Sequence, residues 1–330
     1  MSDEGSQPAA TPAEAPEHKK SRWRGIIGFV IGFLLFSAAI VAVAQGGDDL
    51  KSAWESIKQA PLWLGALVLL LPVLNWLTVS LSFWVITARY GRVGPVEMCG
   101  LIGTAWLLNY LPMKPGMVGR FAYHKKVNGI RYKDSARVIA WTASFTAICT
   151  ALLLAVGVFA RGTSFAYALL LAPLIPFGLL IPAAIARGGH WWRYATALNL
   201  RYLDMLIWTA RYWATFKLVG VDLEPASAAL LAVISQAAIA IPIAGNGLGA
   251  REWAVGVAAN QIGFSAAEIG LAADVINRGA ELIVSLPLGI LGWLYIARRT
   301  KNAVAAPIQP APSSSPPPES TDLPVGDART

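Results

Sequence analysis

The sequence is poor in cysteine, histidine and charge, and these shortages exclude several classes of protein. Its two cysteines, Cys99 and Cys149, both lie in apolar stretches, so we expect neither a disulfide framework nor a metal site. The three histidines, His18, His124 and His190, are scattered along the chain. There is no Walker A or other nucleotide-binding motif and no nucleophile elbow. We therefore expect no cofactor, no metal and no catalytic residues of a soluble enzyme.

The shortage of charge points to a membrane. Charged residues make up 14% of the 330 residues and hydrophobic residues 55%, and the mean hydropathy is +0.52. A soluble fold of this length cannot bury so much apolar surface, so the excess must face lipid. The net charge of +8 would suggest nucleic acid as a partner of a soluble protein, but the basic residues cluster beside apolar segments, where they set topology. We expect an all-α polytopic membrane protein that binds no nucleic acid.

Apolar runs divide the chain into one membrane domain, residues 22–302, and two tails. Residues 1–21 and 303–330 lack apolar periodicity, and we expect both tails to be disordered. About 20 helical residues cross a hydrocarbon core of about 30 Å. Segments of that length predict about six transmembrane helices, at 25–44, 61–87, 134–160, 164–186, 197–219 and 266–296. The first is interpreted as an uncleaved anchor, because its apolar run is longer than that of a signal peptide.

Basic residues in the short loops predict the orientation. Lys19, Lys20 and Arg22 precede the first span, which places the N-terminus in the cytoplasm. Arg298 and Arg299 close the sixth span on the same side. We expect a multi-pass protein of the inner (cell) membrane with both termini cytoplasmic.

Two glycine-rich breaks at matched spacing interrupt the apolar sequence. The first runs from Pro112 to Arg120 and the second from Pro242 to Glu252; in both, a glycine follows the proline by seven residues and an arginine comes soon after. Each break follows a short apolar piece, 96–111 or 225–241, and 16 residues of helix rise only about 24 Å. A full crossing by the first piece would also place many basic residues outside. We therefore expect two re-entrant helical hairpins.

Counting the crossings between the breaks predicts how the hairpins are related. Non-helical backbone at membrane depth must be buried in protein or line a cavity, so the breaks should face one another or a shared cavity. Three expected crossings separate them, so the hairpins must enter from opposite sides. We predict an inverted repeat with copies at about 61–160 and 197–296, a pattern that indicates a transport site.

Charged residues in the last two spans form one-sided stripes. Asp274, Arg278 and Glu281 are spaced i, i+4 and i+7, which places them on one helix face. At the bilayer centre a lone charge costs at least roughly 2.5–3.5 kcal/mol, so these groups must be paired and face inward. They either only hold helices together or handle a substrate or ion. Asp204 and Arg211 of the fifth span are their expected partners.

The breaks add freed backbone groups and charge to this expected site. Glycine allows a close approach of backbone or ligand, and a half-helix that ends in the membrane directs a partial charge into the cavity. Together these features suit an anionic or zwitterionic head group such as a phosphate, although tight turns between helices would also use proline and glycine. The candidate residues of the breaks are Lys114, Gly116, Gly119, Arg120, Gly247, Gly249, Arg251 and Glu252.

The same strings carry a family resemblance. They are Asn109-Tyr110-Leu111-Pro112 through Gly119-Arg120, and Pro242 through Gly247-Leu248-Gly249-Ala250-Arg251-Glu252, followed by Asn277-Arg278 and Pro287-Leu288-Gly289. Over residues 22–298 the chain resembles the transmembrane region of the lysylphosphatidylglycerol synthases, a flippase-like family. The resemblance implies movement of a membrane lipid between leaflets. It also implies a stand-alone flippase-like domain, without the soluble synthase domain of the bifunctional relatives.

Three classes of function stay open at this point. The leading one is translocation of an amphiphilic lipid through a cavity between the repeats. The second is a membrane-embedded lipid-modifying transferase, in which Asp274 or Glu281 would serve as general base, but no donor-binding motif is visible. The third is a non-catalytic partner of a lipid biosynthesis enzyme.

Overall fold

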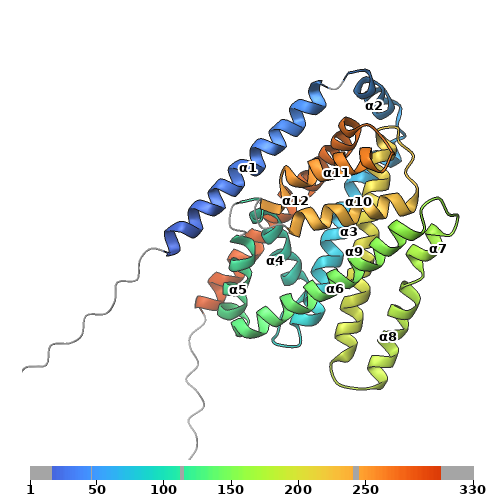
Figure 1. Cartoon of the computed structure of the whole chain (residues 1–330). Helices are drawn as coiled ribbons and strands as arrows, with labels where there is room; N and C mark the ends of the chain where they lie inside the picture. Colours follow the sequence, from blue (N-terminus) through green and yellow to red (C-terminus); the bar gives the residue numbers. More distant parts are fainter. Residues whose placement is uncertain (1–16, 46, 112–114, 241–244, 306–330) are drawn as a thin grey trace, which may run out of the picture.

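The computed structural model describes residues 17–45, 47–111, 115–240 and 245–305, and every secondary-structure element in these ranges is helical (Figure 1). The predicted all-α class is therefore confirmed. The first helix begins at Glu17, inside the stretch expected to be disordered, and the rest of both predicted tails lies almost wholly outside the described residues. The elements are α1 (Glu17–Gln45), α2 (Asp48–Gln59), α3 (Leu62–Thr87), α4 (Pro95–Leu108), α5 (Pro115–Val127), α6 (Tyr132–Phe159), α7 (Ala166–Leu171), α8 (Leu174–Ala186), α9 (Trp191–Leu218), α10 (Pro225–Ala240), η1 (Gly245–Gly247), α11 (Ala250–Gln261) and α12 (Ala267–Ala305).

Five of the six predicted spans are helices long and apolar enough to cross a membrane. They correspond to α1, α3, α6, the consecutive pair α7 and α8, and α12. The predicted span 197–219 lies inside α9, which has 28 residues but carries Arg201, Asp204 and Arg211 among its charges and is not one of the five. Its charged residues are tolerated because α3, α6, α8, α10 and α12 surround it.

Helices α3 and α9 form an antiparallel pair at the centre of the bundle. The Asn75 amide of α3 donates to the Asp204 carboxylate of α9 at 2.7 Å, and the Ser82 hydroxyl donates to the Ala197 carbonyl at 3.3 Å. Residue numbers thus rise along α3 while they fall along α9. The C-terminal end of α3 therefore lies beside the N-terminal end of α9.

This antiparallel pairing places the two hairpins at opposite ends of the bundle (Figure 1). The first hairpin, α4 and α5, follows the C-terminus of α3, and the second, α10 and α11, follows the C-terminus of α9. A helix of 28 residues separates those two ends by about 42 Å. The opposed arrangement agrees with the predicted inverted repeat.

Proline begins three of the four hairpin limbs. Pro95, Pro115 and Pro225 are the first residues of α4, α5 and α10. Proline suits the first turn of a helix, since its missing N–H has no partner there in any case. In α4 the Glu97 carboxylate also accepts a hydrogen bond from the Gly94 N–H at 3.3 Å. Each proline therefore marks the start of a new helix, so these limbs form separate short helices.

The last helix, α12, contacts both hairpins. Its 39 residues extend about 58 Å. Near its N-terminus it meets α11, where a Cβ added to Gly270 would lie 2.9 Å from the Gly256 Cα. Further along it meets α4, where a Cβ added to Gly292 would lie 2.5 Å from the Gly100 carbonyl oxygen. Small residues allow this close packing in membranes, and they let α12 pack against both hairpins.

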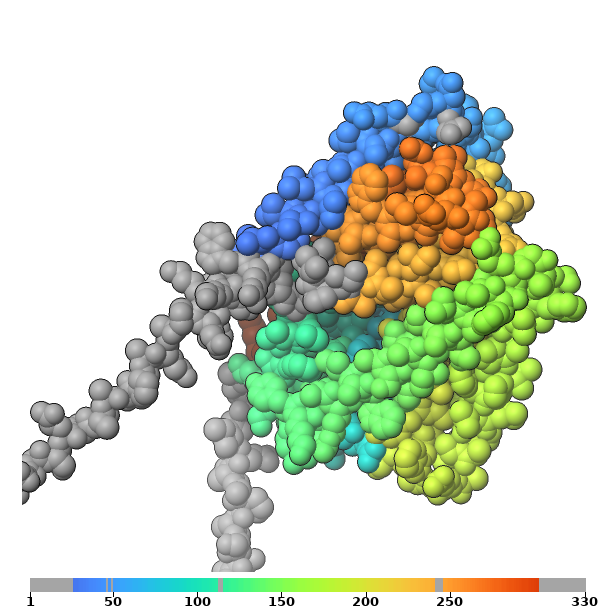
Figure 2. All heavy atoms as spheres, viewed as in Figure 1, coloured from blue at the N-terminus to red at the C-terminus, as the bar shows by residue number. Residues whose placement is uncertain are grey.

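The outer surface of the bundle is apolar. Helix α8 has no buried residue and exposes Ile175, Leu179 and Ile185. Figure 2 shows that part of the second hairpin, α10 and α11, reaches the surface between α1 and α6. These surfaces fit contact with lipid acyl chains, because a protein in water seldom exposes such large apolar patches.

Candidate functional site

The polar stripe of α12 lies inside the bundle. Asp274, Asn277, Arg278 and Ser285 are at most 1% exposed, and Glu281 is 6% exposed. Their spacing of three, four or seven residues puts them on one face, which is turned toward α9 and α11. The predicted inward-facing stripe is confirmed.

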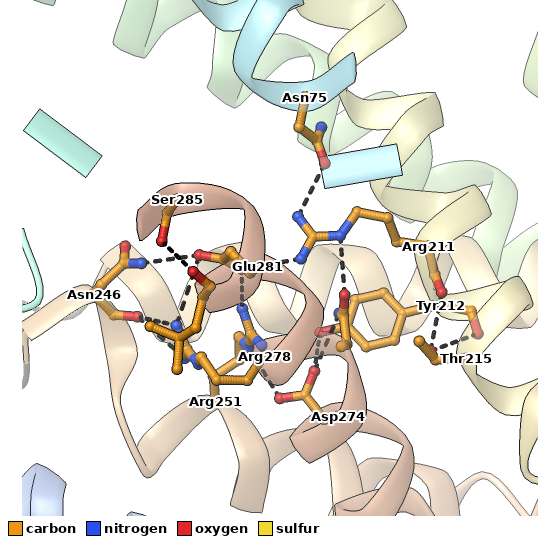
Figure 3. Close-up of polar contacts among 12 residues, drawn as sticks. Asn75, Arg211, Tyr212, Thr215, Asn246, Arg251, Asp274, Arg278, Glu281 and Ser285 are labelled. Carbon is orange, nitrogen blue, oxygen red and sulfur yellow. Dashed lines mark hydrogen bonds and ion pairs between the residues drawn. The ribbon is translucent and has the colours of Figure 1, made fainter. Parts of the chain in front are cut away.

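Three arginines and three carboxylates form one buried network (Figure 3). Arg251 of α11 lies 2.9 Å from the Asp274 carboxylate and 3.0 Å from that of Glu281. Arg211 of α9 reaches the same Glu281 oxygen at 3.0 Å. Arg278 pairs with Glu252 at 2.7 Å and lies 3.9 Å from Glu281, which joins this pair to the other four groups. The formal charges of the six groups cancel. Every arginine in the network thus has a carboxylate partner, as burial of a charge requires.

Both helix breaks meet this network at Glu281. The Tyr110 hydroxyl, just before the first break, donates to Glu281 Oε1 at 2.9 Å. The Asn246 amide, within the second break, donates to the same oxygen at 3.2 Å. The other oxygen, Oε2, accepts the hydrogen bonds from Arg211 and Arg251. One carboxylate therefore connects the two hairpins, which agrees with the expectation that the breaks face one another.

The second break has a backbone that few side chains tolerate. Asn246 has φ +50°, and Gly247 and Gly249 have φ +69° and +77°. The Asn246 carbonyl accepts hydrogen bonds from both terminal nitrogens of Arg278, each at 3.3 Å. A Cβ added to Gly249 would lie 2.5 Å from the Gly32 carbonyl oxygen of α1. The predicted need for glycine at 247 and 249 is confirmed, although α1, not a cavity, crowds residue 249.

Asp204 does not pair with α12, which corrects the expected partnership. Its carboxylate binds Arg201 at 2.9 Å and the Asn75 amide at 2.7 Å. The Asn75 Oδ1 in turn accepts a hydrogen bond from Arg211 at 3.0 Å. Arg201, one turn before Asp204 on α9, takes the place of the α12 charges that the sequence interpretation gave Asp204 as partners. Among the described contacts, Asp204 joins the central network through Asn75.

The candidate residues of the first break lie elsewhere. Lys114 falls outside the described residues. A Cβ on Gly116 would lie 2.5 Å from the Ala105 carbonyl oxygen, so glycine is required there to bring α4 and α5 together. A Cβ on Gly119 would meet nothing within 4 Å, so no close approach of backbone requires glycine there. Arg120 is buried against the ring of Phe83 and does not reach the network.

Several residues of the site were not among the sequence candidates, including Asn75 and Asn277, which accept hydrogen bonds from Arg211. Tyr110 and Asn246 bind Glu281, and the Tyr212 hydroxyl donates to the Asp274 carboxylate at 2.8 Å. Tyr110 lies just before the first break and Asn246 within the second, so their positions in the sequence could have marked them as candidates. Tyr212 follows Arg211 directly on a helix where aromatic residues are common, and nothing in the sequence singles it out.

Comparisons of the chain with protein-family models, curated proteins and solved structures found no match. Within the described ranges, no group of three or more His, Cys, Asp or Glu side chains has the arrangement of a metal site.

Proposed function

We propose that this protein moves an amphiphilic lipid, with an anionic or zwitterionic head group, between the two leaflets through the space between its hairpins. The observation that carries the proposal is that residues at both helix breaks, Tyr110 and Asn246, bind the carboxylate of Glu281. Broken helices that enter from opposite ends and meet near the middle of a bundle are typical of transporters with inverted repeats. The resemblance to the flippase-like family points to the same function.

The geometry around Glu281 suggests how the two ends would open in turn. The Glu281 Oε2 atom accepts hydrogen bonds from Arg211 of α9 and Arg251 of α11. The Glu281 Oε1 atom accepts hydrogen bonds from Tyr110 and Asn246. If the first hairpin moves, the Tyr110 bond to Glu281 is lost. If the second moves, the bonds of Asn246 and Arg251 to Glu281 are lost, together with the Glu252–Arg278 pair. Each hairpin can then expose the centre to its own end of the bundle while the other stays closed. Opposed gates of this kind give alternating access.

The charge balance of the network favours a permeating head group. Three positive and three negative side chains cancel, so the centre neither traps a head group by net charge nor repels one. The chain carries no nucleotide-binding motif, so the movement would be driven by a gradient or would be passive. We infer that residues 22–302 act as one membrane domain in the inner membrane, with both termini in the cytoplasm.

Reconstitution into liposomes tests the proposal. Purified protein is placed in vesicles that contain head-group-labelled fluorescent phosphatidylglycerol, and a membrane-impermeant reductant is added. With protein, the reductant is expected to reach the label from both leaflets; in protein-free vesicles it reaches only the outer leaflet. Chemical conversion of the lipid without movement would indicate the transferase, and neither movement nor conversion would indicate a non-catalytic partner. Both of these outcomes contradict the proposal.

A further inference from the structure

A groove of about 720 Å³ runs along the first hairpin, away from the central network. It lies between α4, α5 and the C-terminal part of α12, and we name it the α5 groove. Its walls include Leu108 and Trp293 and are mostly apolar. Its lining holds three basic residues, Arg120, Lys126 and Lys301, and no acidic one. This volume lies in the range of pockets that hold small ligands.

Arg120 is the unusual member of this lining. It is 9% exposed, and its guanidinium lies 4.2 Å from the centre of the Phe83 ring. The other buried arginines, Arg211, Arg251 and Arg278, each have a carboxylate partner. In the part of the chain that the structure describes, no acidic side chain lies within 4 Å of Arg120 and none accepts its hydrogen bonds. A buried cation of this kind calls for an anion, because a charge is buried at low cost only when it is paired.

We propose that the α5 groove binds a phospholipid with its phosphate at Arg120 and an acyl chain along the apolar walls. This inference deepens the proposed function, on which it rests, by naming the head-group site and the substrate class. A guanidinium recognises a phosphate with two parallel hydrogen bonds donated from its edge, and the stacking of Arg120 on Phe83 involves its face. The charge-balanced network around Glu281 offers no such uncompensated cation.

The rim of the groove supports an approach from the membrane surface. Lys126 lies six residues beyond Arg120 on α5, about 9 Å along the helix axis, and Lys301 lies on α12 at the same groove. Both lysines are exposed. A head group would therefore meet two surface lysines first and the buried arginine deeper in the hairpin. The open space beside Gly119 leaves room for the lipid backbone at that depth.

Lipid binding to the purified full-length protein tests this inference independently of transport. Native mass spectrometry would follow titration with phosphatidylglycerol, with diacylglycerol of the same chains, and with phosphatidylglycerol in excess inorganic phosphate. We expect Arg120→Gln to weaken phosphatidylglycerol binding by about tenfold or more. Gly119→Leu, which fills the groove, is expected to do the same, whereas Lys125→Gln, an exposed cation on the same helix outside the lining, is expected to leave binding unchanged.

Several results would overturn the groove assignment. Equal loss in Lys125→Gln and Arg120→Gln would mean general attraction to basic charge. Diacylglycerol binding as tight as phosphatidylglycerol would remove the phosphate from the recognition, and displacement by inorganic phosphate would mean a site for the free ion. Arg120→Gln is also expected to keep the melting temperature of the lipid-free protein, since no described carboxylate depends on Arg120. Tight binding at Arg120 without transbilayer movement would leave the groove in place and contradict the proposed function alone.

Discussion

Replacement of Arg278 by alanine is expected to destabilise the protein severely. Arg278 is fully buried and holds the Glu252 carboxylate at 2.7 Å and the Asn246 carbonyl at 3.3 Å. Removal of one partner of a buried ion pair typically costs about 3–5 kcal/mol, because the other charge is left uncompensated. The result would be measured as a lower melting temperature and a lower yield of monodisperse protein in detergent.

A matched control and a rescue distinguish this effect from general damage to a helix. Arg137→Ala removes an arginine that is about half exposed, while its partner Asp134 keeps a second arginine, Arg131, at 2.8 Å. Its expected cost is at most about 1 kcal/mol. Adding Glu252→Gln to Arg278→Ala removes the stranded charge and is expected to restore part of the stability. A melting temperature for Arg278→Ala no lower than that of Arg137→Ala would contradict the intramembrane network.

Replacement of Glu281 by glutamine is expected to slow lipid movement by more than about tenfold, which corresponds to about 1.4 kcal/mol in the barrier. The carboxylate accepts hydrogen bonds at both oxygens, from Arg211 and Arg251 at one and from Tyr110 and Asn246 at the other. A glutamine oxygen can serve only one of these pairs, and its NH₂ group faces donors on the other side. Initial rates in the liposome assay would measure the loss.

Asp204→Asn is the matched control for Glu281. Asp204 is also a buried carboxylate that faces an arginine, but its bonds go to Arg201, Asn75 and Thr78, and it bonds to no described residue of either break. Both variants remove one buried negative charge, so a purely structural role predicts equal losses. The gating role predicts that Glu281→Gln loses much more transport rate than Asp204→Asn. The rates would be compared for protein that elutes normally in size-exclusion chromatography. Equal rates in the two variants would contradict that role.

Much of the central site could be predicted from the sequence because helix geometry is local. The i, i+4, i+7 spacing of Asp274, Arg278 and Glu281 leaves one possible face, and the cost of a charge in lipid turns that face inward. The same cost requires a buried partner, and Arg211 supplies it. The convergence of the breaks followed from the need to satisfy freed backbone groups.

What could not be predicted depends on contacts across the bundle. Asp204 and Arg211 lie on one helix two turns apart and both bind Asn75 of α3, yet Asp204 pairs with Arg201 while Arg211 pairs with Glu281 of α12. The helical period alone does not tell which neighbour lies on which side. Arg120 and Arg251 occupy similar places in the two breaks, but only Arg251 meets α12 carboxylates. The charge in the first break therefore lies at a groove and not at the centre, a difference that requires the packed structure.

The central helix is less hydrophobic than a lipid-facing span. The predicted span 197–219 lies in α9, which is enclosed by other helices and uses its polar residues to bind them. Its neighbour α8 has the opposite character, with no buried residue and a wholly apolar sequence. A helix buried in the bundle can carry charge that a lipid-facing helix cannot.

Site-directed labelling tests most directly the opposed orientation of the hairpins in the membrane, on which the whole mechanism depends. Single cysteines at Lys125, near the open end of the first hairpin, and Gln261, near that of the second, occupy exposed positions. They would be placed in a background without Cys99 and Cys149 and treated with a membrane-impermeant thiol reagent. We predict labelling of Lys125→Cys only from the cytoplasmic face and of Gln261→Cys only from the external face. Labelling of both cysteines from the same face would contradict the inverted arrangement and alternating access with it.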